Sequence, residues 1–328
     1  MLTELRPTIS AVVATYQAEG FIVDALDSIL GQTRPADEVI VVDDGSTDGT
    51  ARILESYGSR IRVIRQENRG YPMAMNRAIQ EACGEFVAPC GADDIWEPSK
   101  LEWQAQTLAE HPEVGVLFGH AVFFGHVEGD HVRPVGSGVL DGQDLLKDLL
   151  HTNPINMPSA LIRRELLGRL GWFTDRFLAD DFEFFFRCLR ADVPFYYEPR
   201  TLVRYRRHEH NITKSLPAIH EAMHLVRARN ADRVGDRRLA AETMARDLFV
   251  IGRAHVDEGN RRRGRQAIRR SLRYTEGNTL YTNARAIAWI AILSLPAWAS
   301  GRALQTLPRL RRGIRRLTGS RSAYVGCC

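Results

Sequence analysis

Short β-branched runs alternate with helical patterns along the first hundred residues, and this alternation limits the fold more than any other feature. Two such runs, over 9–14 and 38–42, flank a segment over 22–30 whose apolar residues recur at helical spacing. The pattern continues with a helix expected over about 47–57, a strand over 61–65, a helix over about 72–82 and a strand over 85–89. Alternation of this kind predicts an α/β fold, in which a Rossmann-like, mostly parallel sheet carries helices on both faces.

Polar residues gather where these expected strands end. Four consecutive strand ends carry them, at 15–17, 43–48, 66–70 and 91–94. Open α/β sheets bind ligands beyond the carboxyl ends of their strands. The sequence therefore predicts a ligand site along one edge of the sheet.

The pattern changes beyond about residue 110. Strand-like runs over 114–124 and 195–205 lie in a mixed region, and the chain from 216 onward has a helical pattern, with a hairpin expected over 248–272 around Gly259. We therefore expect a domain over 1–215, followed by a helical appendage over 216–328.

The net charge of +4 conceals an asymmetry between these two parts. From Arg233 onward the chain carries 20 basic and 6 acidic residues, which leaves 24 basic and 34 acidic residues before that point. An acidic front that binds an anion needs a metal or a few well-placed cations, whereas a basic tail suits an anionic membrane or nucleic acid. Solvated helix faces are the alternative explanation of the tail arginines.

The first pair of adjacent acids, Asp43 and Asp44, comes directly after a buried run and before a turn sequence. A carboxylate can accept the imide N–H of uracil or thymine, or the amide and amine hydrogens of guanine. Asp and Ser are also common turn residues, so capping of the loop remains an alternative.

The second pair, Asp93 and Asp94, follows the strand expected over 85–89. Mg²⁺ and Mn²⁺ take oxygen ligands, usually one or two carboxylates, and waters and substrate phosphates supply the rest. The pair is a candidate metal site for a diphosphate ligand. A helix cap is the alternative, because a helix is expected to start around 98–100.

The third pair, Asp180 and Asp181, opens a helical pattern. Asp180 and Glu183 have the spacing of a capping box, and Glu183 can pair with Arg187 one turn later. Asp181 is left over as a candidate general base that accepts a proton from a hydroxyl group. A solvated acid favoured by the helix dipole is the alternative.

Cations and imidazoles follow the last strand-like run, over 205–211. Arg206 can neutralise a diphosphate through two hydrogen bonds, and His208 can ligate a metal or contact a phosphate. An isolated surface histidine is the alternative.

In combination, these motifs resemble the family 2 glycosyltransferases, which have a GT-A fold. The resemblance covers roughly 7–214. It rests on ISAVVATYQ at 9–17, SILGQT at 28–33 and VVDDGSTDGT at 41–50, followed by GEFV leading to Asp93–Asp94 and by GWF at 171–173 leading to Asp180–Asp181. It implies a nucleotide-binding half over about 7–110 and an acceptor half over about 111–215.

The resemblance also implies roles for single residues. Tyr16 and Asp44 would hold the base and Asp93 the ribose, with Thr15 and Arg206 also counted as nucleotide-binding residues. Asp94 and His208 are the expected ligands of Mn²⁺ or Mg²⁺, and Asp181 is the expected base of an inverting displacement. A UDP-sugar is the expected donor, with a GDP- or dTDP-sugar as alternative, and the acceptor is expected to be a saccharide or a lipid-linked saccharide in surface glycan or glycolipid synthesis.

Three positions depart from the family pattern. Gly91 stands where the family usually has an acid, two residues before the metal-binding pair. Met75 precedes Asn76 where a cation is common, and the usual Glu-Asp pair is Asp180–Asp181. These departures raise the question of altered diphosphate handling or sugar choice. No QxxRW sequence follows Asp181, which favours addition of a single sugar.

Two rival functions remain open at this point. One is a nucleotidyltransferase or nucleotide-sugar hydrolase, because a fold does not determine a reaction. The other is a non-catalytic protein that binds a nucleotide-sugar and a membrane. Nucleic acid is not an expected partner, because the sequence offers no reading helix or aromatic platform.

The basic tail is the candidate membrane-binding segment. Six arginines between 302 and 316 alternate with apolar residues, and such a segment can lie in an anionic membrane interface or pack on its own domain. The apolar stretch over 286–299 is about 14 residues long, short of the roughly 20 needed to span a bilayer. Five cysteines without paired spacing, and an N-terminus without a signal pattern, predict a cytoplasmic protein that can be peripheral on the inner face of the cell membrane.

Overall fold

The computed structural model describes residues 6–175, 179–208, 211, 216–274, 286–287 and 289–291. The chain divides into two compact units, residues 1–211 and 212–328. The tail arginines between 302 and 316 lie outside the described residues.

The first unit is an alternation of strands and helices, as the periodicity predicts. Its first half contains β1 (Ile9–Thr15), α1 (Ile22–Leu30), β2 (Glu38–Asp43), α2 (Thr50–Ser56), β3 (Arg62–Arg65), α3 (Tyr71–Glu81), β4 (Phe86–Gly91), β5 (Ile95–Trp96) and α4 (Lys100–Glu110). Its second half contains β6 (Val116–Gly125), β7 (Gly129–Asp130), β8 (Gly138–Val139), α5 (Gly142–His151), β9 (Leu161–Arg163), α6 (Glu165–Leu170), α7 (Asp180–Arg190) and β10 (Phe195–Arg207).

The strands of the described residues form one ten-stranded sheet with the main order β3-β2-β1-β4-β9-β6-β10-β5. The pairs β3–β2, β2–β1, β1–β4 and β6–β10 are parallel. β9 is antiparallel to both β4 and β6, so β4 and β6 point the same way. All the long strands therefore end at one edge, and the expected mostly parallel sheet is confirmed.

The register brings the polar strand ends to one level. Thr15 on β1 pairs with Asp43 on β2, and Asp43 pairs with Arg65 on β3. On the other side of β1, Ala14 pairs with Gly91 on β4. The residues that follow these four strands consequently emerge side by side.

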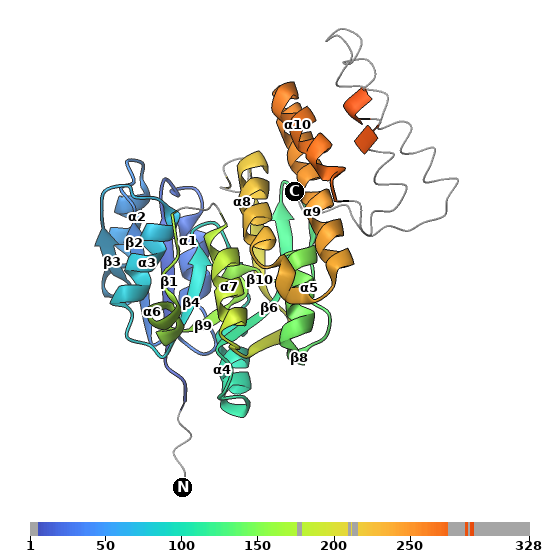
Figure 1. Ribbon diagram of the computed structural model, residues 1–328. Coiled ribbons are helices and arrows are strands. Elements are labelled where there is room, and N and C mark those ends of the chain that lie inside the picture. Colours follow the sequence, from blue (N-terminus) through green and yellow to red (C-terminus); the bar gives the residue numbers. More distant parts are fainter. Residues whose placement is uncertain are drawn as a thin grey trace. The chain divides into compact units, whose positions relative to one another are not determined.

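Helices cover both faces of this sheet (Figure 1). Buried residues of α1, α2 and α4 share one core with alternate residues of β1, β2 and β4, such as Val13, Val41 and Ala88. The intervening strand residues point to the other face. There α3 packs on β1 and β2 through buried residues that include Met75 and Ile79.

One helix begins later than its sequence pattern predicts. The expected helix over 47–57 starts at Thr50, because the preceding residues bond to a neighbouring loop instead. The Gln17 side chain accepts hydrogen bonds from the backbone N–H groups of Thr47 and Asp48 at 2.8 and 3.1 Å. These bonds hold residues 47 and 48 in the loop.

The second unit is helical in its described part, with α8 (Leu216–Ala228), α9 (Arg237–Asp257) and α10 (Arg261–Ser271). The expected hairpin around Gly259 is confirmed by α9 and α10, which pack on each other, and Gly259 has a φ of 84° at the turn. Ala286 and Trp289, from the apolar stretch, pack in a small cluster with Phe249 and Ile268. None of the helices in the described part is long and apolar enough to cross a membrane.

Candidate active site

The end of β1 presents a buried hydroxyl and an exposed ring. Thr15 is 2% exposed, and its Oγ1 has no hydrogen-bond partner among the described residues. Tyr16, the next residue, is 50% exposed. An exposed aromatic ring beside an unsatisfied hydroxyl is suited to contact a planar base and a polar group of the same ligand.

The first acid pair ties together the loops at the ends of β2 and β3. Asp44 is 3% exposed, and its Oδ1 accepts hydrogen bonds from Gln66 Nε2 and from the backbone N–H of Arg69 at 2.8 and 2.9 Å. Its Oδ2 accepts from the N–H of Gly70 at 2.8 Å. Asp43 accepts from the N–H of Ser46 at 2.9 Å. These carboxylates hold the loops after β2 and β3 in place. Loop capping, the alternative interpretation, therefore describes much of their structural role.

The second acid pair contacts residues at the end of β10 and just after it, close to the last residue of the first unit. Asp94 is 1% exposed, and its Oδ1 accepts from the backbone N–H of Arg206 at 3.0 Å. Asp93 Oδ2 lies 2.9 Å from His208 Nε2 and 3.0 Å from Asn211 Nδ2. The structure thus brings four of the predicted site residues together, although His208 contacts Asp93 and not Asp94.

The Arg206 side chain is itself held at several points. Its Nε donates to the carbonyl oxygen of Asp93 at 2.9 Å, and its Nη2 donates to Asp24 Oδ2 at 2.7 Å. The guanidinium also lies over the rings of Phe21 and Phe124, 5.3 and 4.6 Å from their centroids. Such a guanidinium is ordered in advance beside Asp93 and presents its positive charge to an anion with little further loss of entropy.

Burial and the neighbouring Asp93 carboxylate hold the pKa of Asp94 well above its usual range. The space around it is tight, because a Cβ added at Gly91 would lie 2.6 Å from Asp94 Oδ2 and 2.8 Å from Asp93 Oδ1. Gly91, the departure from the family pattern, therefore leaves room for both carboxylates to turn toward the strand end.

The two carboxylates of Asp93 and Asp94 suit a divalent cation whose other ligands come from the substrate and water. The described residues contain no group of three or more His, Cys, Asp or Glu side chains that could hold a metal. Mg²⁺ and Mn²⁺ are often bound through one or two carboxylates, with substrate phosphates and water completing the shell. A cation beside two neighbouring carboxylates stabilises their ionised forms, because its positive charge compensates both negative charges.

The third acid pair differs from the expected capping box. The helix α7 has Ala179 at its N-cap, with no side-chain cap, and Asp180 is the first helical residue. The backbone N–H of Glu183 donates to the Ala179 carbonyl, so the prediction of an Asp180 cap is wrong. The helix starts where its phenylalanines become buried, and this places Asp180 inside the protein at 7% exposure.

Asp181 is the partly exposed member of that pair. Its Oδ1 accepts from the N–H of Phe182 at 2.6 Å, which fixes the carboxylate at the helix start. Burial raises the pKa of Asp181, and burial together with the Asp181 charge raises the pKa of Asp180 to about 8. A carboxylate with a raised pKa is a stronger base than an ordinary one.

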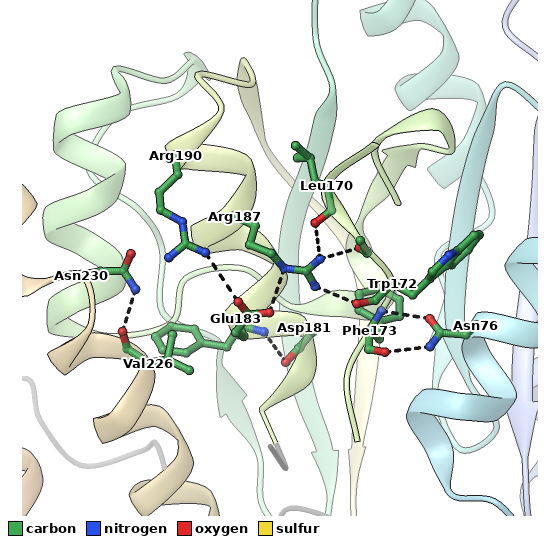
Figure 2. A network of polar contacts seen from close by, with 12 residues as sticks. Asn76, Leu170, Trp172, Phe173, Asp181, Glu183, Arg187, Arg190, Val226 and Asn230 are labelled. Carbon is green, nitrogen blue, oxygen red and sulfur yellow. Dashed lines mark hydrogen bonds and ion pairs between the residues drawn. The ribbon is translucent and has the colours of Figure 1, made fainter. Parts of the chain in front are cut away.

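A network of polar contacts fixes the segment that precedes this pair (Figure 2). Arg187 pairs with Glu183 at 2.8 Å, as expected, and also donates to the carbonyl oxygens of Leu170, Gly171 and Trp172. Asn76 on α3 exchanges two hydrogen bonds with the backbone of Phe173, at 2.8 and 3.0 Å. The helix α3 is thereby linked to the segment that leads to Asp181.

Tyr71, at the start of α3, is a site residue that sequence reasoning missed. Burial raises its pKa well above the usual value, and the carboxylates of Asp180, Asp181, Asp94 and Asp93 raise it further. The charges of both the second and the third acid pair therefore act on this phenol. The one signal in the sequence is an aromatic residue after Gly70 at the start of a helix.

A second motif on α8 resembles a metal site but has other partners. His220, Glu221 and His224 form an HExxH pattern, which in zinc peptidases holds the metal on one helix face. Here Glu221 lies 2.8 Å from His255, and His224 faces Asp247 at 3.7 Å. These are contacts between α8 and α9, and we interpret them as helix pairing.

Comparison with known proteins gives the family. Residues 10–171 match the family described as glycosyl transferase family 2. A putative teichuronic acid biosynthesis glycosyltransferase, TuaG of Bacillus subtilis, is 40% identical over 113 residues, which cover 33% of this chain and 45% of TuaG. An uncharacterized glycosyltransferase of Rickettsia felis is 27% identical over 221 residues, 64% of this chain and 36% of that protein. The chain thus spans less than half the length of these curated relatives.

Solved structures share the fold. The chain is similar to S. aureus TarS 1–349 in complex with UDP-GlcNAc, with a TM-score of 0.63 and 19% identity over 87% of this chain and 90% of that one. It is also similar to the mannosyltransferase PcManGT of Pyrobaculum calidifontis in complex with GDP-Man and Mn²⁺, with a TM-score of 0.55 and 21% identity over 96% and 88%. The α/β fold with a mostly parallel sheet is the GT-A type, and residues 10–171 of this chain belong to glycosyl transferase family 2.

Proposed function

We propose that the protein transfers a sugar from a nucleotide-diphosphate sugar to an acceptor hydroxyl group, with inversion at the anomeric carbon. The observation that carries this proposal is the set of contacts by which Arg206 and His208, at the end of β10, hold the Asp93–Asp94 pair at the end of the parallel strands. The charges of this pair and of the Asp180–Asp181 pair both act on the phenol of Tyr71. A donor-side acid pair and an acceptor-side acid pair at one site are what a direct displacement requires.

On the donor side, Tyr16 stacks on the base and Thr15 and Asp44 contact its polar edge, while Asp93 contacts the ribose. Arg206, held beside Asp93, neutralises part of the diphosphate charge. Asp94 and His208 would hold the divalent cation. A bound Mn²⁺ or Mg²⁺ supplies positive charge to the leaving diphosphate.

On the acceptor side, Asp181 takes the proton of the attacking hydroxyl group. The new bond joins the acceptor oxygen to the anomeric carbon as the bond from that carbon to the phosphate oxygen breaks, and the nucleoside diphosphate leaves. A single displacement of this kind inverts the configuration. The Phe182 N–H keeps the Asp181 carboxylate in place during the step.

The comparisons support the substrate class. TarS is described in complex with UDP-GlcNAc and PcManGT in complex with GDP-Man and Mn²⁺, and TuaG is described as a putative teichuronic acid biosynthesis glycosyltransferase. We propose a UDP-sugar as donor, with GDP- and dTDP-sugars as alternatives. The proposed acceptor is a saccharide or a lipid-linked saccharide, in surface glycan or glycolipid synthesis.

The test is turnover of UDP-, GDP- and dTDP-sugars with Mn²⁺ and saccharide acceptors, for the wild type and for Asp181→Asn. Loss of the general base is expected to lower kcat by about 10²–10⁴-fold, while donor affinity stays unchanged. Asp192→Asn, at an exposed position just beyond the C-terminal end of α7, is the matched control and is expected to keep full activity. Full transfer by Asp181→Asn would show that another group acts as the base.

The same assay separates the rival reactions. A hydrolase would consume the donor equally fast without an acceptor. A nucleotidyltransferase, given a nucleoside triphosphate and a sugar 1-phosphate in place of the nucleotide-sugar, would form the nucleotide-sugar and release pyrophosphate. Either result as the main activity would refute the proposed transfer.

A further inference from the structure

The helix α10 in the second unit carries a concentrated positive charge. Its sequence, RRRGRQAIRRS, contains no acidic residue. Five of its arginines define what we call the basic face: Arg262, Arg263, Arg265, Arg269 and Arg270. At 100° per residue they lie within about 160° of the helix circumference, with Gln266 as the one other residue among them.

The opposite side of α10 is locked against α9 by close backbone contact. A Cβ added at Gly264 would lie 2.7 Å from the carbonyl oxygen of Gly252 and 2.4 Å from a Val256 methyl group. A Cβ added at Gly252 would lie 2.8 Å from the Gly264 carbonyl. The helix cannot rotate about its axis without breaking this contact, so the basic face points away from α9.

The arginines of the basic face have no carboxylate partner in the described part of the chain. Other arginines of the same unit do have one, since Arg227 pairs with Asp247 at 3.0 Å and Arg238 with Glu242 at 3.1 Å. Arg262, Arg263, Arg269 and Arg270 are exposed. Their positive charge is therefore directed to solvent.

This arrangement works against the stability of the helix itself. Arg262 and Arg263 lie in the first turn, where the helix dipole disfavours cations. Arg265 and Arg269 are four residues apart, and like charges at that spacing repel. An external anion that neutralises these charges removes both costs.

We propose that the basic face of α10 docks on an anionic phospholipid surface. Arginine binds phosphate through two parallel hydrogen bonds, and clusters of arginine close to a membrane are attracted to acidic headgroups. The apolar stretch that packs beside Ile268 also leaves Ile287 58% exposed, so the same unit presents an apolar side chain to solvent. The basic face carries no aromatic residue on which a nucleic-acid base could stack.

This inference assigns the membrane contact to one described helix of the basic tail, outside the segment over 302–316, and it does not depend on the proposed sugar transfer. The test uses the full chain and sedimentation with vesicles of phosphatidylcholine, with and without about one third phosphatidylglycerol. The wild type is expected to sediment only with the anionic vesicles, and to be released at about 0.5 M salt because such contacts are screened.

The informative variant is Arg262→Gln/Arg269→Gln, which removes two charges from the centre of the basic face. Its partition onto anionic vesicles is expected to fall by roughly tenfold or more. The matched control is Arg237→Gln/Arg238→Gln at the exposed start of α9, which removes the same net charge and is expected to bind within about twofold of the wild type.

Equal losses in the two variants would mean that net charge and not the basic face drives binding, and equal binding to neutral vesicles would exclude an electrostatic contact. Retardation of a single-stranded oligonucleotide without vesicle binding would assign the face to nucleic acid. Each of these results overturns the proposal. Arg265→Gln/Arg270→Gln provides a second variant with the same expected loss, in case the first lowers the melting temperature.

Discussion

Two pairs of adjacent aspartates lie at the ends of β2 and β4, the strands on either side of β1, and their surroundings differ. The oxygens of Asp43 and Asp44 are bound by backbone and side-chain donors of the loops at 46 and 65–70. Asp93 and Asp94 receive their bonds mainly from Arg206, His208 and Asn211, more than 110 residues away. The first pair mainly stabilises the loops next to it. The second pair is held by residues from the end of β10, which reach it only when the whole first unit is folded.

The electrostatic consequence is specific to the second pair. Burial and the adjacent Asp93 charge raise the pKa of Asp94, while a single backbone N–H compensates its Oδ1. A group that is costly to ionise is more often found at a functional site than in a stabilising network. We therefore expect substitutions at the first pair to cost stability and substitutions at the second pair to cost activity.

The largest effect is expected for Asp94→Asn. The amide oxygen can still accept from the Arg206 N–H, but the charge needed to hold a cation is gone. Cation stabilisation of a leaving diphosphate is worth several kcal/mol, so turnover is expected to fall by at least about 100-fold. Mn²⁺-dependent nucleotide binding, measured by calorimetry, is expected to disappear.

Thermal unfolding of Asp94→Asn shows whether lost activity comes from lost cation binding or from lost stability. Removal of the buried Asp94 carboxylate beside the partly exposed Asp93 relieves repulsion, so the melting temperature is expected to stay equal or rise. Nucleotide binding that still required Mn²⁺ in Asp94→Asn would show that the cation is held elsewhere.

Asp44→Ala is expected to have the opposite profile. It leaves the N–H groups of Arg69 and Gly70 and the Gln66 amide without their acceptor. Charge-assisted bonds of this kind contribute about 1.5–3 kcal/mol each but are not additive, so a loss of about 2–4 kcal/mol is expected in urea unfolding. Because Asp44 is also proposed to contact the base, nucleotide binding is expected to weaken as well, and a variant with unchanged stability would show that these bonds contribute little to folding.

How much of the fold and the site the sequence predicts depends on how far apart in the chain the interacting residues lie. The strands, the helices on both faces and the polar edge were predictable, because hydrophobic period and parallel strand ends are local properties. The start of α7 was not, because capping-box spacing does not tell whether the aspartate is buried. Tyr71 was missed for a similar reason, since its neighbours come from two distant acid pairs that only the folded chain brings close.

Gly91→Ala tests whether the space beside the second pair matters. The added methyl group would lie 2.6 Å from Asp94 Oδ2, so the carboxylates must turn or the strand end must shift. Overpacking of this kind costs about 1–3 kcal/mol, and we expect the lower half of that range together with a raised KM for the donor. Gly142→Ala, where an added Cβ meets nothing within 4 Å, is the control and is expected to leave KM unchanged.

The third pair extends the comparison to a buried acid that is held protonated. Because the pKa of Asp180 is raised from 3.8 to about 8 in the folded protein, the folded state keeps a proton that the unfolded chain loses as pH rises through about 4. Wild-type stability is therefore expected to decline between about pH 4 and pH 8, and Asp180→Asn, which cannot ionise, is expected to lack this decline. The free energy of unfolding can change by at most about 1.4 kcal/mol per pH unit through one such group, and sharing of charge with Asp181 lowers this value. We therefore expect the difference in free energy of unfolding between variant and wild type to grow by about 1 kcal/mol from pH 5.5 to pH 7.5. Urea unfolding at the two pH values measures it, and a constant difference would mean that Asp180 is already ionised in the folded protein.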